Sequence, residues 1–329
     1  MNSLHNPIGL GTIRDAIAND LNAVDSIIRQ RLKSEVALIN QISYYIIEAG
    51  GKRLRPALVL LAGHLFGADR YKIQSLAAVI EFIHTATLLH DDVVDESAMR
   101  RGRKTANSEF GNAASVLVGD FLYSRAFQMM VEAGSVRVMQ VLAEATNVIS
   151  EGEVLQLLNV HDPDVDEDTY LQVVRYKTAK LFEAASRVGA ILGGAPANDE
   201  QLLAEYGMHL GTAFQLIDDV LDYSGEPAEM GKNIGDDLAE GKPTLPLIYA
   251  MRKGSTTQRN AIRHIIEQGG HDKMETVIGA IHETGALSYS RQQAQHEAKI
   301  AEQSILHLPD SIYREALLQL CVFAVERKV

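Results

Sequence analysis

Apolar residues recur at intervals of three and four along almost the whole chain, the spacing of an amphipathic helix. Ile13, Ile17, Leu21, Val24, Ile27 and Ile28 predict a first helix, and Ile39, Ile42, Ile46 and Ile47 a second. Further helices are predicted from Pro56, at about 73–95, and at 108–133, 135–159, 167–193, 199–224, 242–253, 256–268, 287–306 and 310–327. Period-two alternation and short repeats are lacking. The pattern predicts an all-α, single-domain bundle of long helices around a central cavity, spanning residues 1–329.

Two of the predicted helices end in the same pattern, a pair of aspartates followed by a third. They are Asp91, Asp92 and Asp95 in the helix predicted at about 73–95, and Asp218, Asp219 and Asp222 in the helix predicted at 199–224. Residues four apart lie on one face of a helix, so Asp91 and Asp95 point the same way. Their carboxylates repel each other unless a cation lies between them. Hard oxygen ligands favour Mg²⁺, which binds through a few carboxylates plus substrate phosphates.

Cationic side chains accompany both clusters. They are Lys52, Arg53 and Arg55 before the third predicted helix, Arg100 and Arg101 after the first aspartate cluster, and Lys177 beside Thr178 within a later helix. A guanidinium group can grip a phosphate through two hydrogen bonds, and a helix N-terminus favours an anion. Each group alone is equally typical of a solvated surface. Together with two aspartate clusters they indicate a phosphate-and-metal site.

Three other segments are weaker signals. Residues 226–242 contain glycines and two lysines, Lys232 and Lys242, without helical periodicity, which is typical of a lid over an anionic-ligand site. Glu153 and Gln156 lie on a predicted helix, where solvated polar positions are the simplest interpretation. The C-terminal residues 326–329 are expected to be a solvated tail.

Composition narrows the class of protein. Of 329 residues 46% are apolar, enough for a large core, and 31 Lys plus Arg against 43 Asp plus Glu give a net charge of −12. This excess of acidic residues argues against a nucleic-acid-binding protein, which needs a positively charged surface. The single cysteine, Cys321, excludes an internal disulfide and fits a reducing cytoplasm. We find no signal-peptide pattern and no apolar run near the roughly 20 residues of a membrane span, so we expect a soluble cytoplasmic protein.

The motifs GGKRLRP, LLHDDVVDESAMRRG, KTA, FQLIDDVLDY and GDDLAEGKPTLP together resemble the trans-polyprenyl diphosphate synthase family. The resemblance runs from about residue 45 to the last helix, in the family's order, and covers residues 1–45 less well. The phrases GDFLYSRAFQMM and EGEVLQLLNVHDPD are similar, more narrowly, to the bacterial members that make octaprenyl diphosphate for the ubiquinone side chain.

This resemblance implies a prenyltransferase that adds isopentenyl diphosphate units to an allylic diphosphate such as farnesyl diphosphate. It implies two to three Mg²⁺ ions per site, a homodimer, and a long product handed to the membrane. The implied metal ligands are Asp91, Asp95, Asp218 and Asp222; Asp92, Asp219 and Lys177 complete the catalytic set. Lys52, Arg55, His84 and Arg101 would hold isopentenyl diphosphate, and Arg100, Lys177, Thr178, Gln215 and Lys232 the allylic diphosphate. Without the motif, His84 would more simply be a core histidine.

Chain length is attributed in this family to the residue five positions before the first aspartate, which here is Ala86. Helical spacing alone would choose Thr87, about 40° from Asp91, over Ala86, about 140° away. Both side chains are small, so the channel below the site should be open and the product long. Leu117, Met129 and Met130 are candidates for a deeper stop, although core packing explains each equally well.

Other classes fit less well. A terpene cyclase usually pairs one aspartate cluster with an Asn/Ser-containing motif, whereas this chain has two aspartate clusters. A His-Asp hydrolase would need further His and Asp ligands besides His90 and Asp91, and these are not evident. A ferritin-like di-iron bundle needs paired Glu-x-x-His helices. A non-catalytic subunit of a heteromeric synthase typically lacks one aspartate cluster, whereas both are whole here. A shorter-chain geranylgeranyl synthase remains an alternative product class.

Overall fold

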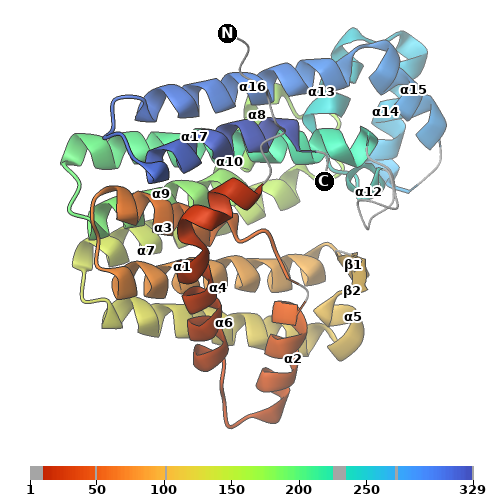
Figure 1. Ribbon diagram of the computed structural model, residues 1–329. Helices are drawn as coiled ribbons and strands as arrows, with labels where there is room; N and C mark the ends of the chain where they lie inside the picture. Colours follow the sequence, from red (N-terminus) through yellow and green to blue (C-terminus); the bar gives the residue numbers. More distant parts are fainter. Residues whose placement is uncertain (1–9, 49, 101, 225–234, 271–272, 328–329) are drawn as a thin grey trace.

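The computed structural model describes residues 10–48, 50–100, 102–224, 235–270 and 273–327, and they form an all-α bundle (Figure 1). The helices are α1 (Leu10–Arg31), α2 (Ala37–Glu48), α3 (Leu54–Leu65), α4 (Arg70–Val94), α5 (Ala106–Phe110), α6 (Asn112–Glu132), α7 (Val136–Asn159), α8 (Glu167–Val173), α9 (Lys180–Leu192), α10 (Ala197–Ser224), α12 (Asp236–Ala239), α13 (Leu245–Lys253), α14 (Thr256–Gln268), α15 (Met274–Glu283), α16 (Ala286–Ile305) and α17 (Ile312–Glu326). A π-helical turn, η1 (Val174–Ala179), joins α8 to α9. Strands β1 (Met99–Arg100) and β2 (Arg103–Lys104) form a short antiparallel hairpin.

The predicted all-α class is confirmed, with several local differences. The predicted helix 108–133 is broken at Gly111, whose positive φ of 87° ends α5 and lets α6 begin in a new direction. The predicted helix 167–193 contains the π-helical turn η1. Helices α12 and α15 lie in the stretches 226–242 and 269–286, where the sequence pattern predicted no helix.

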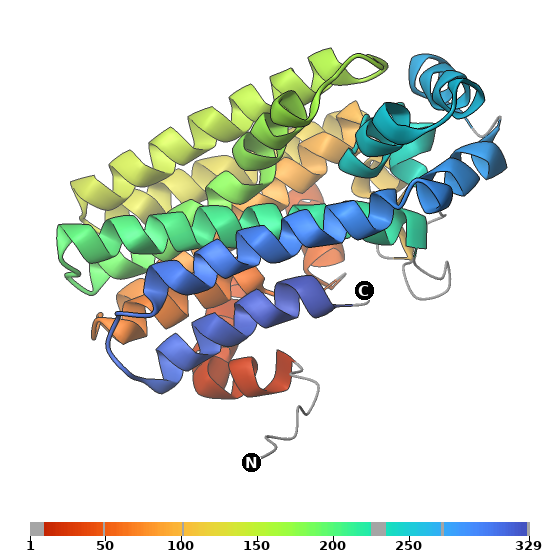
Figure 2. The same ribbon diagram turned by 90° about the horizontal axis from the view of Figure 1, so that it is seen from above.

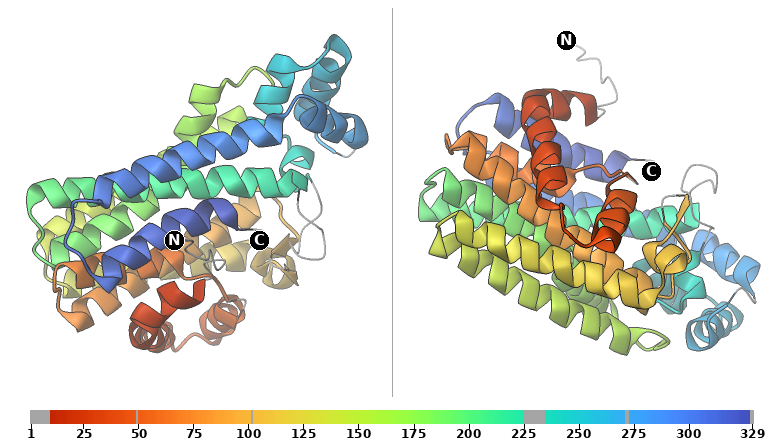
Figure 3. Two further views of the ribbon diagram at one scale, coloured as in Figure 1. Left: turned by 45° about the horizontal axis from the view of Figure 1, so that its top comes forward. Right: turned by 90° about the horizontal axis from the view of Figure 1, so that it is seen from below.

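Two long helices, α4 and α10, organise the bundle. They run roughly parallel, and their C-terminal ends lie at the same end of the molecule (Figures 1 and 2). Helix α4 packs against α3, α6, α1 and α9, while α10 packs against α9, α16 and α17. Helices α1 and α2 lie on the outside of the bundle, with α1 crossing the long helices (Figure 3). The two aspartate clusters, one at each C-terminal end, are thereby brought to one place.

The centre of α4 is almost wholly buried, from Ile73 through Ile83. Within the described ranges α4 is the one helix long and apolar enough, by length and composition, to cross a membrane, and 67% of its most apolar window is buried. The core helix of a globular protein passes the same test. The packing of α4 against its neighbouring helices therefore accounts for its composition.

Gly189 of α9 lies against the backbone of α3. A Cβ atom there would lie 2.6 Å from the carbonyl oxygen of Val59 and 2.8 Å from the amide nitrogen of Gly63. Both obstacles are backbone atoms of one helix, which cannot move aside independently. The close contact between α3 and α9 therefore requires glycine at this position.

We predict that Gly189→Ala lowers the free energy of unfolding by about 1–3 kcal/mol, the usual cost of overpacking a core. Gly279→Ala in α15 is the control, because nothing lies within 4 Å of its Cβ position. It should be neutral or stabilising by up to about 1 kcal/mol, since alanine favours a helix over glycine. Urea unfolding measures both, and equal stability of the two variants would contradict the prediction.

Candidate active site

A large cavity opens at the C-terminal ends of α4 and α10, with about 2930 Å³ of empty space, part of it open solvent. Most of the residues that the sequence indicated lie around it. They are Asp91, Asp95, Asp218, Asp219, Asp222, Lys52, Arg55, His84, Thr87, Arg100, Lys177, Thr178 and Gln215. Arg101 and Lys232 lie outside the described residues. Carboxylates and cations from distant parts of the chain therefore share one cavity.

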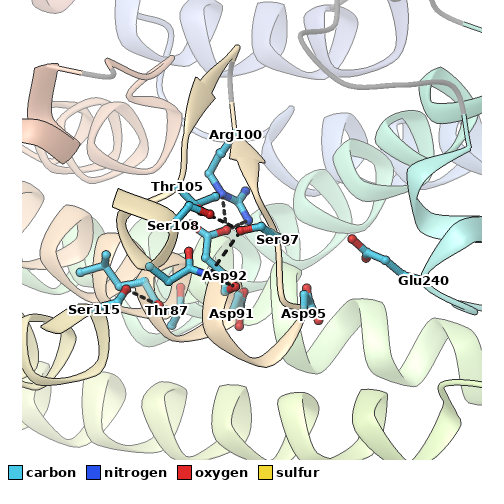
Figure 4. Close-up of polar contacts among 12 residues, drawn as sticks. Thr87, Asp91, Asp92, Asp95, Ser97, Arg100, Thr105, Ser108, Ser115 and Glu240 are labelled. Carbon is cyan, nitrogen blue, oxygen red and sulfur yellow. Dashed lines mark hydrogen bonds and ion pairs between the residues drawn. The ribbon is translucent and has the colours of Figure 1, made fainter. Parts of the chain in front are cut away.

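Asp91 and Asp95 face the cavity from α4 (Figure 4). Asp91 Oδ2 lies 3.5 Å from Lys177 Nζ, and Asp95 Oδ2 lies 2.8 Å from Lys242 Nζ. Burial lowers the pKa of Lys242, but Asp237, Asp95 and other carboxylates outweigh it, so this pKa is raised and the ammonium stays charged. The like charges of the first cluster are thus balanced by two lysines.

Asp92 turns away from the cavity and is buried. Its Oδ1 accepts a hydrogen bond from Arg100 Nε at 2.8 Å and forms an ion pair with Arg100 Nη2 at 2.7 Å (Figure 4). Burial raises the pKa of Asp92 although Arg100 opposes this. Asn107 binds the backbone carbonyl of Asp92, which fixes the chain after α4. Asp92 therefore positions Arg100 at the cavity edge, and its membership of the catalytic set stays a prediction.

Lys177 owes its place to the π-helical turn, a feature often found at functional sites. Its Nζ contacts Glu153 Oε2 at 2.5 Å and donates to Gln156 Oε1 at 2.7 Å. Both partners lie on α7 and line the cavity, so their interpretation as solvated positions was wrong. Burial, and next the charge of Asp91, raises the pKa of Glu153 to about 7.

The turn approaches α7 closely because Gly152 has no side chain. A Cβ atom there would lie 2.6 Å from the amide nitrogen of Lys177 and 2.8 Å from the Tyr176 Cβ. Arg175 and Lys180, by contrast, pair with carboxylates of other helices, at distances of 3.6 and 3.0 Å, and do not line the cavity. Of the cations in this stretch, Lys177 alone faces the cavity.

The second aspartate cluster is tied to Thr178 by a chain of hydrogen bonds. Asp219 accepts hydrogen bonds at both oxygens, from the Tyr170 hydroxyl and from Gln215 Nε2 at 2.8 Å. Gln215 Oε1 in turn accepts from the Thr178 hydroxyl at 3.0 Å. Burial and the charge of Asp237 raise the pKa of Asp219 to about 8. Asp219 therefore orients its neighbours, while Asp218 and Asp222 are the second cluster's other cavity-lining carboxylates.

Arg327 at the end of α17 was expected in a solvated tail, but its side chain is only 3% exposed. Its Nη2 lies 2.7 Å from Asp218 Oδ1 and donates to the Phe214 carbonyl at 2.6 Å. The guanidinium carbon also lies 3.7 Å from the centre of the Phe214 ring, a cation–π contact. The C-terminal end of the described chain is therefore part of the site.

Lys52, Arg55 and His84 occupy the cavity wall beside α3. Arg55 Nη1 lies 3.2 Å from His84 Nε2, and since arginine only donates, that nitrogen accepts and the ring proton is assigned to Nδ1. Arg55 also stacks on Phe182 at 4.5 Å. Arg53 also borders the cavity, but its largely buried side chain is paired with Asp25 and Glu81.

The positions predicted to set chain length are separated by the structure. Thr87 lines the cavity, as helical spacing suggested, whereas Ala86 is fully buried and does not. Met129 and Met130 are buried in the main apolar core. Leu117 is 67% exposed on the outside of α6, so it is not a deep stop in this chain.

The site chemistry fits a divalent cation without a preformed cage. Among the described residues no group of three or more His, Cys, Asp or Glu side chains lies close enough together to hold a metal ion. The carboxylates of Asp91, Asp95 and Asp218 point into the same cavity from two walls, each beside a cationic side chain. Such a donor set suits a hard cation that also binds phosphate oxygens and water, as Mg²⁺ does.

Four residues that line the cavity were not singled out as functional by the sequence: Tyr170, Glu153, Gln156 and Arg327. Lys242, by contrast, was expected at the site as part of the segment 226–242, and it lines the cavity. The four missed residues lie on predicted helices, whose periodicity shows only that a position is polar or lies at a helix end. Their partners are far away in sequence.

Comparison with known proteins gives consistent results. Residues 36–282 match the family model described as polyprenyl synthetase. The chain is 53% identical to an octaprenyl diphosphate synthase from Escherichia coli over 97% of this chain and 99% of that protein. It is 48% identical to an all-trans-nonaprenyl-diphosphate synthase from Rhodobacter capsulatus over 94% and 96%. A polyprenyl synthase from Caulobacter crescentus, solved with calcium and isoprenyl diphosphate, superposes with a TM-score of 0.94 at 42% identity, covering 98% of both chains.

We predict that Tyr170→Phe weakens the binding of inorganic diphosphate with Mg²⁺ by about tenfold, or about 1.4 kcal/mol. The reason is that Asp219 loses one of its two donors, so Gln215 and Thr178 are held less firmly. Isothermal titration calorimetry measures the change. Tyr289→Phe is the control, because that hydroxyl binds Glu167 away from the cavity. Equal affinities of the two variants would show that the Tyr170 hydrogen bond has no part in binding.

Proposed function

The chain belongs to the polyprenyl synthetase family, and from this premise we propose how its cavity performs prenyl transfer. The enzyme is a prenyltransferase that synthesises long-chain all-trans polyprenyl diphosphates. The observation that carries the proposal is the meeting of both aspartate clusters and Lys52, Arg55, His84 and Lys177 in one cavity.

Isopentenyl diphosphate binds, in this proposal, at the wall formed by Lys52, Arg55 and His84, with Arg101 as a further ligand. Lysine and arginine supply charge-assisted hydrogen bonds to phosphate oxygens. Arg55 is pre-oriented by Phe182 and His84, so little side-chain freedom is lost on binding. The neutral His84 can donate from Nδ1.

The allylic diphosphate binds on the opposite side, between the aspartate clusters. Lys177, Thr178, Gln215 and Arg100 are its protein ligands, with Lys232 completing the set. Asp91, Asp95, Asp218 and Asp222 would hold the two to three Mg²⁺ ions that serve as its counter-cations. The dependence on a divalent metal agrees with the calcium and isoprenyl diphosphate in the Caulobacter crescentus structure. When bound, these ions supply the positive charge that stabilises the departing diphosphate.

The reaction breaks the bond between the allylic carbon and its diphosphate oxygen. The allylic cation then forms a carbon–carbon bond with the double bond of isopentenyl diphosphate, and a proton is lost to the released diphosphate. Lys177 and Arg100 stay charged throughout, because neighbouring carboxylates hold both pKa values above their usual range although burial lowers them. They therefore stabilise negative charge and transfer no proton.

The finer assignments are octaprenyl diphosphate as product, farnesyl diphosphate as primer and a role in supplying the ubiquinone side chain. The octaprenyl synthase from Escherichia coli, 53% identical, supports the product length. The enzyme acts in the cytoplasm and hands its product to the membrane. Purified protein incubated with farnesyl diphosphate, radiolabelled isopentenyl diphosphate and Mg²⁺, followed by mass analysis of the product, tests these assignments. A main product of geranylgeranyl size would contradict them.

A second copy of the chain is proposed to cover α6. Leu117, Phe127 and Val131 lie on one face of this helix, with exposed fractions of 67%, 42% and 61%. A row of large exposed apolar side chains on a soluble protein marks an interaction surface.

We predict that the metal ligands are essential. Asp91→Ala and Asp218→Ala should each lower turnover more than tenfold, a loss above about 1.4 kcal/mol, because each removes charge needed against the departing diphosphate. Unfolding temperature should stay near wild type. Asp168→Ala, which removes an exposed carboxylate on α8, is the control and should keep full activity. If Asp91→Ala or Asp218→Ala retained more than a tenth of the activity, the assigned metal role would be wrong.

Chain length should respond to the residue that lines the cavity. Thr87→Tyr should shorten the main product to farnesyl or geranylgeranyl size, since the ring fills space one turn from Asp91. Thr87→Ser is the control and should leave product length unchanged. Product analysis by mass spectrometry gives the answer.

The resemblance attributes the same effect to Ala86→Tyr. Ala86 lies one turn before Leu89 and His90, which contact Ser115 and Val116 of α6. A tyrosine at position 86 therefore meets α6. If Ala86→Tyr folded normally and shortened the product while Thr87→Tyr did not, the channel would run along α6.

The wild-type protein should sediment as a homodimer at micromolar concentration. The double variant Leu117→Glu/Val131→Glu should sediment as a monomer. Each copy would bring two glutamates into the contact between the copies, where burying unpaired charges is costly. Ile312→Glu, at an exposed apolar residue of α17, is the control. A wild-type monomer with full activity would end the proposal of a dimer.

A further inference from the structure

One buried carboxylate in the bundle has no part in the reaction described above. Glu297 of α16 is only 7% exposed, and it does not line the cavity. Burying a charge is costly unless the charge is paired and hydrogen-bonded. The partners of Glu297 therefore indicate what this charge is used for.

Glu297 joins three elements through its two carboxylate oxygens. Its Oε2 accepts a hydrogen bond from His209 Nδ1 on α10, and its Oε1 lies 3.6 Å from Arg175 Nη2 on the π-helical turn η1. Because an ionised carboxylate only accepts, the ring proton of His209 is assigned to Nδ1. The hydrogen bond from His209 orients the carboxylate toward the guanidinium of Arg175. Glu297 thereby connects η1 with both α10 and α16.

Arg175 precedes Lys177 by two residues in the same turn. Side chains two positions apart in a helical turn do not face each other, and here Lys177 lines the cavity whereas Arg175 does not. Lys177 contacts Glu153 and Gln156 on α7. The turn η1 is therefore held by α7 through Lys177 and by α16 through Arg175.

The position of this turn decides where two ligands of the proposed diphosphate site lie. Lys177 and Thr178 are consecutive residues of η1, and the Thr178 hydroxyl donates to Gln215 Oε1 at 3.0 Å. A π-helical turn is rare and short, so its side chains stay in place only through the contacts that the turn makes with its neighbours. Loss of the contact between Arg175 and α16 would let Lys177 and Thr178 shift together.

We propose that Glu297 is a positioning residue for prenyl transfer, which holds the π-helical turn through Arg175 and so fixes Lys177 and Thr178 for the allylic diphosphate. The inference rests on the proposed function, which assigns the allylic diphosphate to these two residues. Glu297 lies outside the cavity lining, so it acts through the turn and not on the substrate.

The test is steady-state kinetics of the full-length protein with farnesyl diphosphate and isopentenyl diphosphate. Glu297→Gln keeps the size of the side chain and removes its charge. It should raise KM for farnesyl diphosphate about threefold, as expected for one lost ion pair or hydrogen bond, and leave KM for isopentenyl diphosphate unchanged. Arg175→Gln should give the same result. The double variant should be no worse than either single variant, because the two residues act as a pair.

Glu302→Gln is the matched control. Glu302 lies on the same helix and also pairs with a cation, Lys299 at 2.9 Å, but it has no contact with η1. Neither KM should change in this variant. A loss of folded protein alone would lower kcat and leave both KM values unchanged, so KM for farnesyl diphosphate separates positioning from stability.

Lys177→Gln, measured beside these variants, separates this inference from the proposed function. If Lys177→Gln leaves KM for farnesyl diphosphate unchanged, the proposed diphosphate site is wrong and this inference falls with it. If Lys177→Gln raises that KM but Glu297→Gln and Arg175→Gln do not, the positioning role alone is overturned. Equal rises of both KM values in Glu297→Gln, or additive effects in the double variant, would also overturn it.

Discussion

The carboxylates at the ends of α4 and α10 repel one another, and the site depends on the cations that balance them. Lys177 and Lys242 balance the first cluster, and Arg327 contacts the second. In a partly buried cavity such interactions are much stronger than in water, so an unbalanced carboxylate there would be costly. The same arrangement prepares the cavity for a ligand that carries its own negative charge and its own cations.

These balancing cations come from elements that are remote in sequence from the aspartates. Lys177 lies on the π-helical turn, Lys242 follows α12, and Arg327 follows α17. Their contacts exist only when the bundle is closed, so the charge balance of the site and the packing of the fold are coupled. The contact of Gly152 with η1 shows how closely α7 packs against this turn, since even a methyl group at position 152 would displace Lys177.

Helix α4 serves different purposes on its different faces. One face carries Asp91 and Thr87 into the main cavity, and another packs Leu89 and His90 against α6. This one helix thus contributes both the charged entrance of the cavity, at Asp91, and a wall of small or apolar side chains. Prenyl transfer needs both, because the diphosphate must be held in place while the hydrocarbon lengthens away from it.

The sequence by itself determined the fold class, most helix positions and the membership of the two aspartate clusters, because these depend on local periodicity and on spacing within one helix. It also favoured Thr87 over Ala86 as the cavity-facing residue, since a 100° step per residue is a local property. Tertiary structure alone decided that Asp92 turns away from the cavity to hold Arg100, and that Asp219, at the cavity wall, is tied to Tyr170 and Gln215. It likewise decided that Glu153, Tyr170 and Arg327 belong to the site. The physical reason is that a side chain's partner, and with it burial and charge state, is set by elements that meet only when the bundle packs.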